Sequence, residues 1–283
     1  MTRIQDYDVS DPIQGKVVST ERLTPDNSKV EIRDIVLQLN KSDFAFKIGQ
    51  SIGVIAPGKE KHGTKHHFRL YTVAGEDPAK NTIRLCVKRC FYIDDFNGER
   101  YEGIASNYLC NLKEGEEISL AGPFGIPFKL PEEKAADILM IGMGTGIAPF
   151  RAFVRDLYEK EGGWNGQVRL FYGAKTGMEL AYMNDQKNDF EHYYDKKTFK
   201  AFEAVSPKPL FNAPVAMTEA LEKNSEEIWN MLLNRKVHVY VAGLESIKNM
   251  LSKAFVKIAG NQRTWESKYR ELNKSGRWQE LIY

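Results

Sequence analysis

Three glycines that could take part in ligand binding are Gly142, Gly144 and Gly146. They stand between an apolar run at 137–141 and a helical pattern at 151–157. Such a run is typical of a buried strand, so the glycines lie where a strand turns into a helix. Glycine lets the backbone approach a ligand closely, and the free N–H groups of a helix start attract negative charge. The stretch predicts a loop that binds a pyrophosphate, with a tight turn that holds no ligand as the alternative. Its G-x-G-x-G spacing differs from the G-x-G-x-x-G dinucleotide fingerprint.

Length and composition set the limits for this chemistry. The chain has 283 residues, enough for one large domain or two of ordinary size. Hydrophobic residues make up 42% and charged residues 28%, which excludes a wholly disordered chain. No stretch reaches the length of a transmembrane helix, and the first residues hold no apolar signal core, so we expect a cytoplasmic protein. A net charge of +2 gives no case for nucleic-acid binding.

The cysteines and histidines argue against a metal. Cys86, Cys90 and Cys110 cannot form a complete disulfide framework or a four-cysteine iron–sulfur or zinc site. We expect each to be a reduced, buried small residue. The histidines of the 59–67 run have no cysteine or carboxylate cluster beside them, so no metal site is predicted. One-electron chemistry would therefore need a bound organic cofactor or a separate partner.

The first 130 or so residues are β-rich. Short segments with strand-like patterns are separated by turn residues, which favours a small antiparallel barrel. A short helix is expected at 106–112, with Ser106 or Asn107 near its cap. The predicted strands are 15–23, 30–39, 44–55, 68–74, 82–88 and 116–120.

From about residue 134, strands alternate with helices, which predicts a parallel sheet. The predicted strands are 137–141, 167–173, 200–205 and 237–242, the predicted helices include 151–157, 179–190 and 218–233, and further helices and a tail follow. Ligands of such sheets lie beyond the carboxyl ends of the strands, here at Gly142–Gly146, Gly173, Ser206 and Gly243. The fold class is therefore β + α/β, with a β-barrel domain at 1–132 and a nucleotide-binding domain at 133–283.

Four segments, in this order, resemble motifs of one family. Arg69-Leu-Tyr-Thr resembles its R-x-Y-[S/T] flavin motif, and Gly103-Ile-Ala-Ser is similar to its second flavin motif. Gly144-Thr-Gly-Ile-Ala-Pro-Phe resembles its nicotinamide-nucleotide loop, and Gly243-Leu with the terminal Tyr283 also fits. The family is the plant-type ferredoxin–NADP(+) reductases, and the resemblance covers nearly the whole chain. Four motifs in the family's order are much stronger evidence of membership than a single motif.

The resemblance implies FAD and NADP(H) as cofactors, with NAD(H) as the alternative nucleotide. Arg69 and Ser106 would meet the FAD pyrophosphate, and Tyr92 would stack on the adenine. Tyr71 and Tyr283 would cover the two faces of the flavin ring, with Tyr283 moving aside for nicotinamide. The implied catalytic residues are Thr72, whose hydroxyl can reach flavin N5, Tyr283 and Glu280. The implied cofactor-binding residues are Arg69, Tyr71, Thr72, Lys88, Tyr92, Gly103, Ala105, Ser106, Gly144, Thr145, Gly146, Pro149, Ser206, Lys208, Gly243 and Tyr283.

Three departures from the family pattern bear on turnover and nucleotide choice. Ala242 stands where the family usually has a cysteine near the nicotinamide, and Leu281 stands where a glutamate is expected, with Glu280 one place earlier. The arginine expected after Ser206 is replaced by proline, and the later Lys-x-Tyr positions hold Pro214 and Ala216. Lys208 could still meet a 2′-phosphate, and the overall branch favours NADPH over NADH.

The basic run at 59–67 resembles the lysine-bearing loop with which the family docks acidic ferredoxins. Lys59, Lys61 and Lys65 would steer ferredoxin or flavodoxin electrostatically. From charge alone, the alternative is a solvated loop.

The sequence therefore predicts a flavin-dependent reductase that moves electrons between NADPH and a one-electron protein carrier. Hydride would pass at flavin N5, and catalysis would consist mainly of positioning. One alternative is an NADH-linked reductase component of an oxygenase system, which would share every motif. The other is a flavin electron-transfer subunit with weak intrinsic turnover, which Ala242 and Leu281 keep open.

Overall fold

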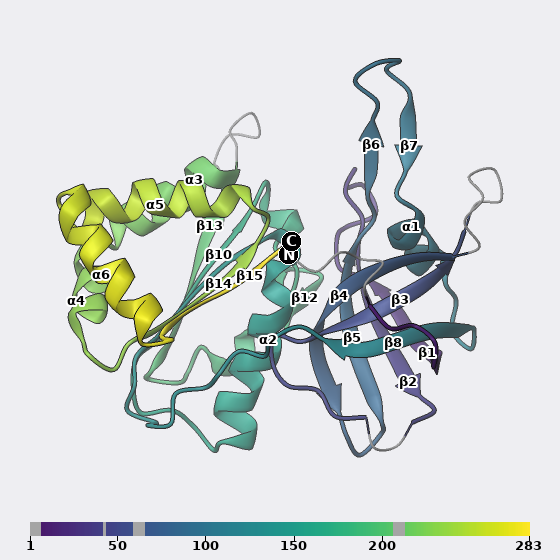
Figure 1. Ribbon diagram of the computed structural model, residues 1–283, viewed down its shortest axis with the longest axis horizontal. Helices are drawn as coiled ribbons and strands as arrows, with labels where there is room; N and C mark the ends of the chain where they lie inside the picture. Colours follow the sequence, from purple (N-terminus) through teal and green to yellow (C-terminus); the bar gives the residue numbers. More distant parts are fainter. Residues whose placement is uncertain (1–6, 42–43, 59–65, 206–212) are drawn as a thin grey trace. The chain divides into compact units, whose positions relative to one another are not determined.

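The structure is a computed structural model that describes residues 7–41, 44–58, 66–205 and 213–283 (Figure 1). The chain divides into two compact units, residues 1–127 and 128–283. The domain limits expected from the sequence, 1–132 and 133–283, remain a prediction. No helix of the described ranges is long and apolar enough to cross a membrane.

The first unit is a closed antiparallel barrel of six strands, which confirms the predicted architecture. Its order is β1 (Ile13–Arg22), β2 (Ile32–Leu39), β5 (Thr82–Lys88), β4 (His66–Asp77), β3 (Ser51–Pro57) and β8 (Glu117–Phe124). Inward side chains such as Ile35, Val54 and Leu85 are fully buried and form the barrel core. A short helix, α1 (Ile104–Asn111), adds Leu109 and Cys110 to that core.

Two parts of this unit differ from the predictions. The predicted strand 44–55 is wrong in its first half, because β3 begins at Ser51 after a turn at Gly49, where φ is +85°. Phe44 and Phe46 pack against the barrel core and against each other, with ring centroids 4.9 Å apart. Their alternation reflects this packing and not sheet pairing. The structure also contains a hairpin that was not predicted from the sequence. It consists of β6 (Phe91–Ile93) and β7 (Arg100–Glu102) and extends from the barrel in Figure 1.

The second unit is built on a five-stranded sheet whose neighbouring strands are all parallel, as predicted. Its order is β13 (Phe199–Val205), β10 (Val168–Ala174), β9 (Ile138–Met143), β14 (His238–Gly243) and β15 (Trp278–Ile282). Strand β15 falls in the predicted tail. This strand has only five residues, with one buried tryptophan, and its hydrophobic pattern is too short to predict a strand from the sequence.

Helices cover both faces of this sheet (Figure 1). On one face, Leu139, Val241 and Trp278 pack against four helices, α3 (Ala213–Lys223), α4 (Ser225–Leu233), α5 (Ser246–Ile258) and α6 (Gln262–Lys274). On the other face, α2 (Ile147–Arg155) packs Phe153 against Tyr240, with ring centroids 4.7 Å apart. Side chains that alternate along each strand thus pack on one face or the other.

Two helix predictions in this unit need correction. The segment 179–190 is not helical: short 3-10 turns at Gly177–Glu179 and Glu191–Tyr193 flank a small ladder of β11 (Met183–Asn184) and β12 (Lys187–Asn188). The side chain of Asn184 accepts the N–H groups of Gln186 and Lys187, which favours a turn over a helix. The predicted helix 218–233 is divided at Asn224 into α3 and α4.

Candidate flavin and nucleotide sites

Strand β4 carries the first flavin motif. Arg69 and Tyr71 lie on one face of the strand, and Thr72 lies on the other, because side chains alternate along a strand. Arg69 is exposed, and its guanidinium donates one long bond of 3.4 Å to the Phe68 carbonyl. Tyr71 packs against the barrel core, and burial raises the pKa of its phenol, so it stays a neutral ring. The Thr72 hydroxyl lies 3.4 Å from that of Ser51. This strand thus presents a cation, a ring and a hydroxyl.

The second flavin motif forms the start of α1. The Ser106 hydroxyl accepts the N–H of Cys90 at 3.1 Å and donates to the Gly103 carbonyl at 3.3 Å. A Cβ on Gly103 would lie 2.9 Å from that hydroxyl and 3.1 Å from the Cys90 carbonyl, so only glycine fits without a shift. Ala105 is buried beside it. Ser106 therefore holds the helix start against the chain that leaves β5, and the first N–H groups of α1 have no partner within the helix.

A polar network that the sequence reasoning missed supports this helix start. Arg89 donates to Glu31 at 2.6 Å and to Asn107 at 2.8 Å, and the Asn107 amide donates to the carbonyls of Cys90 and Gly103. Burial alone would raise the pKa of Glu31, but hydrogen bonds from Arg89 and Arg33 lower it below its usual value. No motif marks this network, because its members lie far apart in the chain. Lys88, a predicted ligand, is half-buried at the end of β5, next to Arg89.

The hairpin β6–β7 places Tyr92 on its surface. Tyr92 is 59% exposed and stacks on Tyr101, with ring centroids 5.2 Å apart and an interplanar angle of 17°. The Tyr92 ring therefore gives the hairpin an exposed aromatic surface. Such a surface suits stacking with a planar base.

In the second unit, the glycine loop runs from the end of β9 through a 3-10 turn, Gly144–Gly146, into α2. Gly144 has φ +57°, a conformation that favours glycine, and the space where its Cβ would stand is open. A Cβ on Gly146 would lie 2.3 Å from the carbonyl oxygen of Ala242, so this glycine allows the loop to pack against the end of β14. Pro149 is buried in the first turn of α2. Backbone packing thus builds this loop.

Thr145, Gly243 and Tyr283 come together beside the loop. The Thr145 hydroxyl lies 2.9 Å from the Tyr283 hydroxyl, and the Tyr283 N–H donates to the Gly243 carbonyl at 3.2 Å. Tyr283 is 50% exposed, and Gly243 has φ +154°. The structure therefore brings together residues that stand 138 positions apart in the chain.

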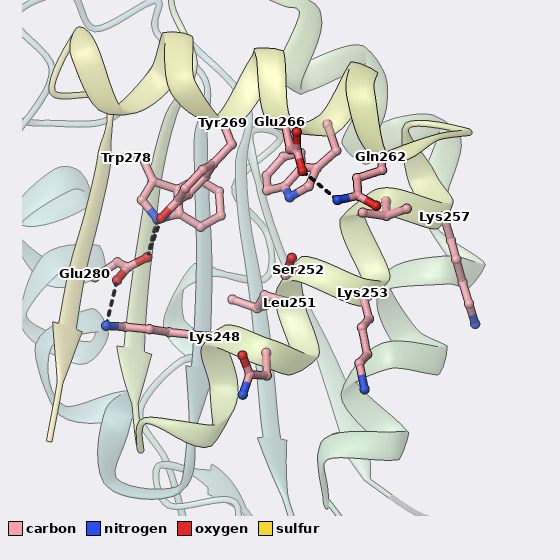
Figure 2. A pocket seen from close by; sticks show the side chains of 13 residues that line it. Lys248, Leu251, Ser252, Lys253, Lys257, Gln262, Glu266, Tyr269, Trp278 and Glu280 are labelled. Carbon is pink, nitrogen blue, oxygen red and sulfur yellow. Dashed lines mark hydrogen bonds and ion pairs between the residues drawn. The ribbon is translucent and has the colours of Figure 1, made fainter.

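Glu280 is not part of this group. It lies on the face of β15 that packs against α5 and α6, whereas Gln279, its neighbour, bonds to Lys129 on the other face. Figure 2 shows its carboxylate at one end of a cleft of about 690 Å³, where the Trp278 indole N–H donates to it at 2.6 Å. The Lys248 ammonium lies 3.5 Å away. Of the two predicted catalytic residues in this unit, Tyr283 therefore lies beside the glycine loop and Glu280 does not.

Five predicted residues lie outside the described part of the chain. They are Ser206 and Lys208, expected near the nucleotide 2′-phosphate, and Lys59, Lys61 and Lys65, expected to dock the protein carrier.

Comparison with known proteins defines the class. Residues 14–128 match the family of oxidoreductase FAD-binding domains, and residues 140–253 match that of oxidoreductase NAD-binding domains. The protein is thus a flavin- and nicotinamide-nucleotide-binding oxidoreductase. It is 32% identical to a ferredoxin–NADP reductase of Synechocystis over 98% of this chain and 69% of the relative. It is also 32% identical to the cyanelle ferredoxin–NADP reductase of Cyanophora paradoxa, over 97% of this chain and 77% of the relative.

The chain therefore belongs to the ferredoxin–NADP reductase family, as its motifs predicted. The fold agrees: the Plasmodium falciparum ferredoxin-NADP+ reductase aligns over 99% of both chains with a TM-score of 0.77 and 23% identity.

Proposed function

We propose that this protein uses bound FAD to move electrons between NADPH and ferredoxin. One observation carries the proposal: over 98% of its length, the chain is 32% identical to a protein named ferredoxin–NADP reductase. FAD, when bound, can take a hydride at N5 and release electrons singly, which joins a two-electron donor to a one-electron carrier.

In the barrel unit, the exposed Arg69 guanidinium would pair with the FAD pyrophosphate. The N–H groups at the start of α1, around Ala105 and Ser106, would add neutral donors to the same phosphates. Tyr71 would pack on the flavin ring, and Tyr92 would stack on the adenine, where its exposed face supports the role. Thr72 would direct its hydroxyl to N5, and Lys88 would add positive charge.

In the second unit, the N–H groups of Gly144, Thr145 and Gly146 would bind the nucleotide pyrophosphate at the N-terminus of α2. Pro149 would fix the first turn of that helix. Gly243 and Tyr283 would border the nicotinamide, with Tyr283 giving up its bond to Thr145 as the nucleotide enters.

Ser206 and Lys208 would bind the 2′-phosphate and select NADPH. A role for Glu280 in proton transfer has no support from its position, because its carboxylate bonds to Trp278 on the helix-covered face of β15.

The partner would be an acidic electron carrier. Ferredoxin is the main candidate, and flavodoxin could bind through the same electrostatic attraction. Lys59, Lys61 and Lys65 would steer it, so association should weaken as salt rises. A cytoplasmic location stays a prediction.

The direct test is NADPH-driven reduction of ferredoxin by the FAD-loaded protein, followed by absorbance under anaerobic conditions. We expect ferredoxin reduction that saturates with ferredoxin and slows with added salt. Replacing Lys59, Lys61 and Lys65 by glutamate should raise KM for ferredoxin, while replacing the exposed Lys16, Lys113 and Lys274 should not. Oxidation of NADPH without reduction of either carrier would contradict the proposal and favour a dedicated acceptor, such as an oxygenase component.

A further inference from the structure

Tyr172, near the carboxyl end of β10, places a polar atom behind the glycine loop. It is fully buried, and its backbone lies opposite Gly142 in the sheet. Its hydroxyl donates to the Gly144 carbonyl at 3.0 Å and accepts the N–H of Ala181 at 3.1 Å. The Gly144 carbonyl also accepts the N–H of Ile147 in the first turn of α2. One buried hydroxyl therefore connects the glycine loop to the segment that follows β10.

That segment is itself tightly held. Tyr182 has φ +64°, which is rare for a residue with a side chain, and it is fully buried. The Arg151 guanidinium of α2 lies 5.0 Å from the centre of the Tyr182 ring and bonds to Asp189 at 2.5 Å. These contacts attach the segment to α2, and the Tyr172 hydroxyl connects it to Gly144.

The glycine loop needs such a support. Gly144 has no side chain, stands at a positive φ and faces open space, so no side-chain packing of its own fixes its peptide planes. A bond that holds the Gly144 carbonyl toward the protein interior leaves the following N–H groups free to face a ligand. Donors that are fixed before binding lose less entropy when an anion arrives.

We propose that Tyr172 is a positioning residue that preorganises the Gly144–Gly146 loop for the pyrophosphate of the nicotinamide nucleotide. The inference rests on the proposed function, because it assumes that this loop binds the nucleotide. Tyr172 touches no reacting atom and acts through Gly144.

The chain offers a matched control in Tyr240. It is also a fully buried tyrosine, on β14 of the same sheet, and its hydroxyl donates to the Lys129 carbonyl at 2.6 Å. That bond lies away from the glycine loop. Tyr172→Phe and Tyr240→Phe therefore each remove one buried hydroxyl, but only the first removes a bond to Gly144.

The experiment compares both variants with the wild type as full-length, FAD-loaded proteins. For Tyr172→Phe we expect Kd for NADP+ and KM for NADPH to rise about tenfold, equal to roughly 1.4 kcal/mol, with kcat at saturation unchanged within about twofold. Tyr240→Phe should leave Kd and KM within about twofold of wild type, even if its Tm falls as far as the Tm of Tyr172→Phe. Amide hydrogen exchange without nucleotide should quicken at Gly144–Ile147 in Tyr172→Phe alone.

Equal KM values in the two variants, or unchanged exchange at Gly144–Ile147 in Tyr172→Phe, would overturn the inference. The exchange measurement needs no nucleotide, so it decides the matter even if Tyr172→Phe loses FAD. Failure of the proposed function is a separate result: the wild type itself would then not bind NADP+.

Discussion

The proposed phosphate sites of the two units rely on different parts of the chain. In the barrel, side chains do the work: Arg69 offers charge, and Ser106 and the Glu31–Arg89–Asn107 network hold the start of α1. In the second unit, the backbone does the work, because Gly146 lets the loop pack against the Ala242 carbonyl. At a site made of side chains, each substitution should lower the ligand affinity by a limited amount. At a site made of backbone packing, one substitution that disturbs the packing should lower the affinity much more.

The largest effect is expected for Gly146→Ala. The new Cβ would meet the Ala242 carbonyl oxygen at 2.3 Å, and backbone cannot move aside as a side chain can. Distortion of about 3 kcal/mol would weaken NADP+ binding more than about 100-fold. FAD binding by the barrel should persist, as measured by flavin content. Gly177→Ala is the control, because its Cβ would meet nothing within 4 Å. Wild-type affinity for NADP+ in Gly146→Ala would break the comparison.

Arg69→Ala should have the next largest effect, confined to the flavin. Hydrogen bonds to charged groups are worth about 1.5–3 kcal/mol, so FAD affinity should fall roughly 10- to 100-fold. The Tm of the FAD-free protein should not change, because this exposed side chain makes one long bond within the described part of the chain. Fluorescence titration with FAD measures the first and thermal unfolding the second. Lys16→Ala, an exposed cation on β1, should alter neither.

Glu31→Gln tests the network through pH. The folded-state pKa of Glu31 is lowered, so its ion pairs stabilise the barrel above the ordinary pKa of 4.5 and lose that effect as pH falls through the lower folded value. The wild-type Tm should therefore fall more steeply below pH 4.5 than the Tm of Glu31→Gln. At neutral pH, the variant should be the less stable protein. Parallel Tm profiles would contradict the role of the network, and Glu117→Gln, exposed on β8, should behave as wild type.

The smallest effect is expected for Glu280→Gln. Its carboxylate bonds to the Trp278 indole on the helix-covered face of β15, away from Tyr283 and Thr145. The turnover number with NADPH should stay within about twofold of wild type, and its pH profile should keep its shape. A drop beyond about tenfold, together with the loss of one limb of the pH profile, would contradict this expectation and favour proton delivery by Glu280.

The same contrast explains what could be predicted from the sequence. Glycines in a backbone-built loop are marked by residue type, so Gly144 and Gly146 could be found along with the barrel and the parallel sheet. The Glu31–Arg89–Asn107 network and Tyr172 could not, because each joins segments distant in the chain through ordinary residue types. The helix predicted at 179–190 was wrong because local turns at Tyr182 and Asn184 outweigh its helical pattern.

If a nicotinamide nucleotide held at Gly144–Gly146 reduces FAD held by the barrel, the bound flavin should lose its colour when the nucleotide is added. Anaerobic stopped-flow bleaching of the bound flavin, with NADPH and NADH run side by side, tests it most directly. We expect rapid bleaching by NADPH and much slower bleaching by NADH at equal concentration. A flavin that stays bound and oxidised with both nucleotides would contradict the account, and the protein would then be an electron-transfer subunit without hydride chemistry of its own.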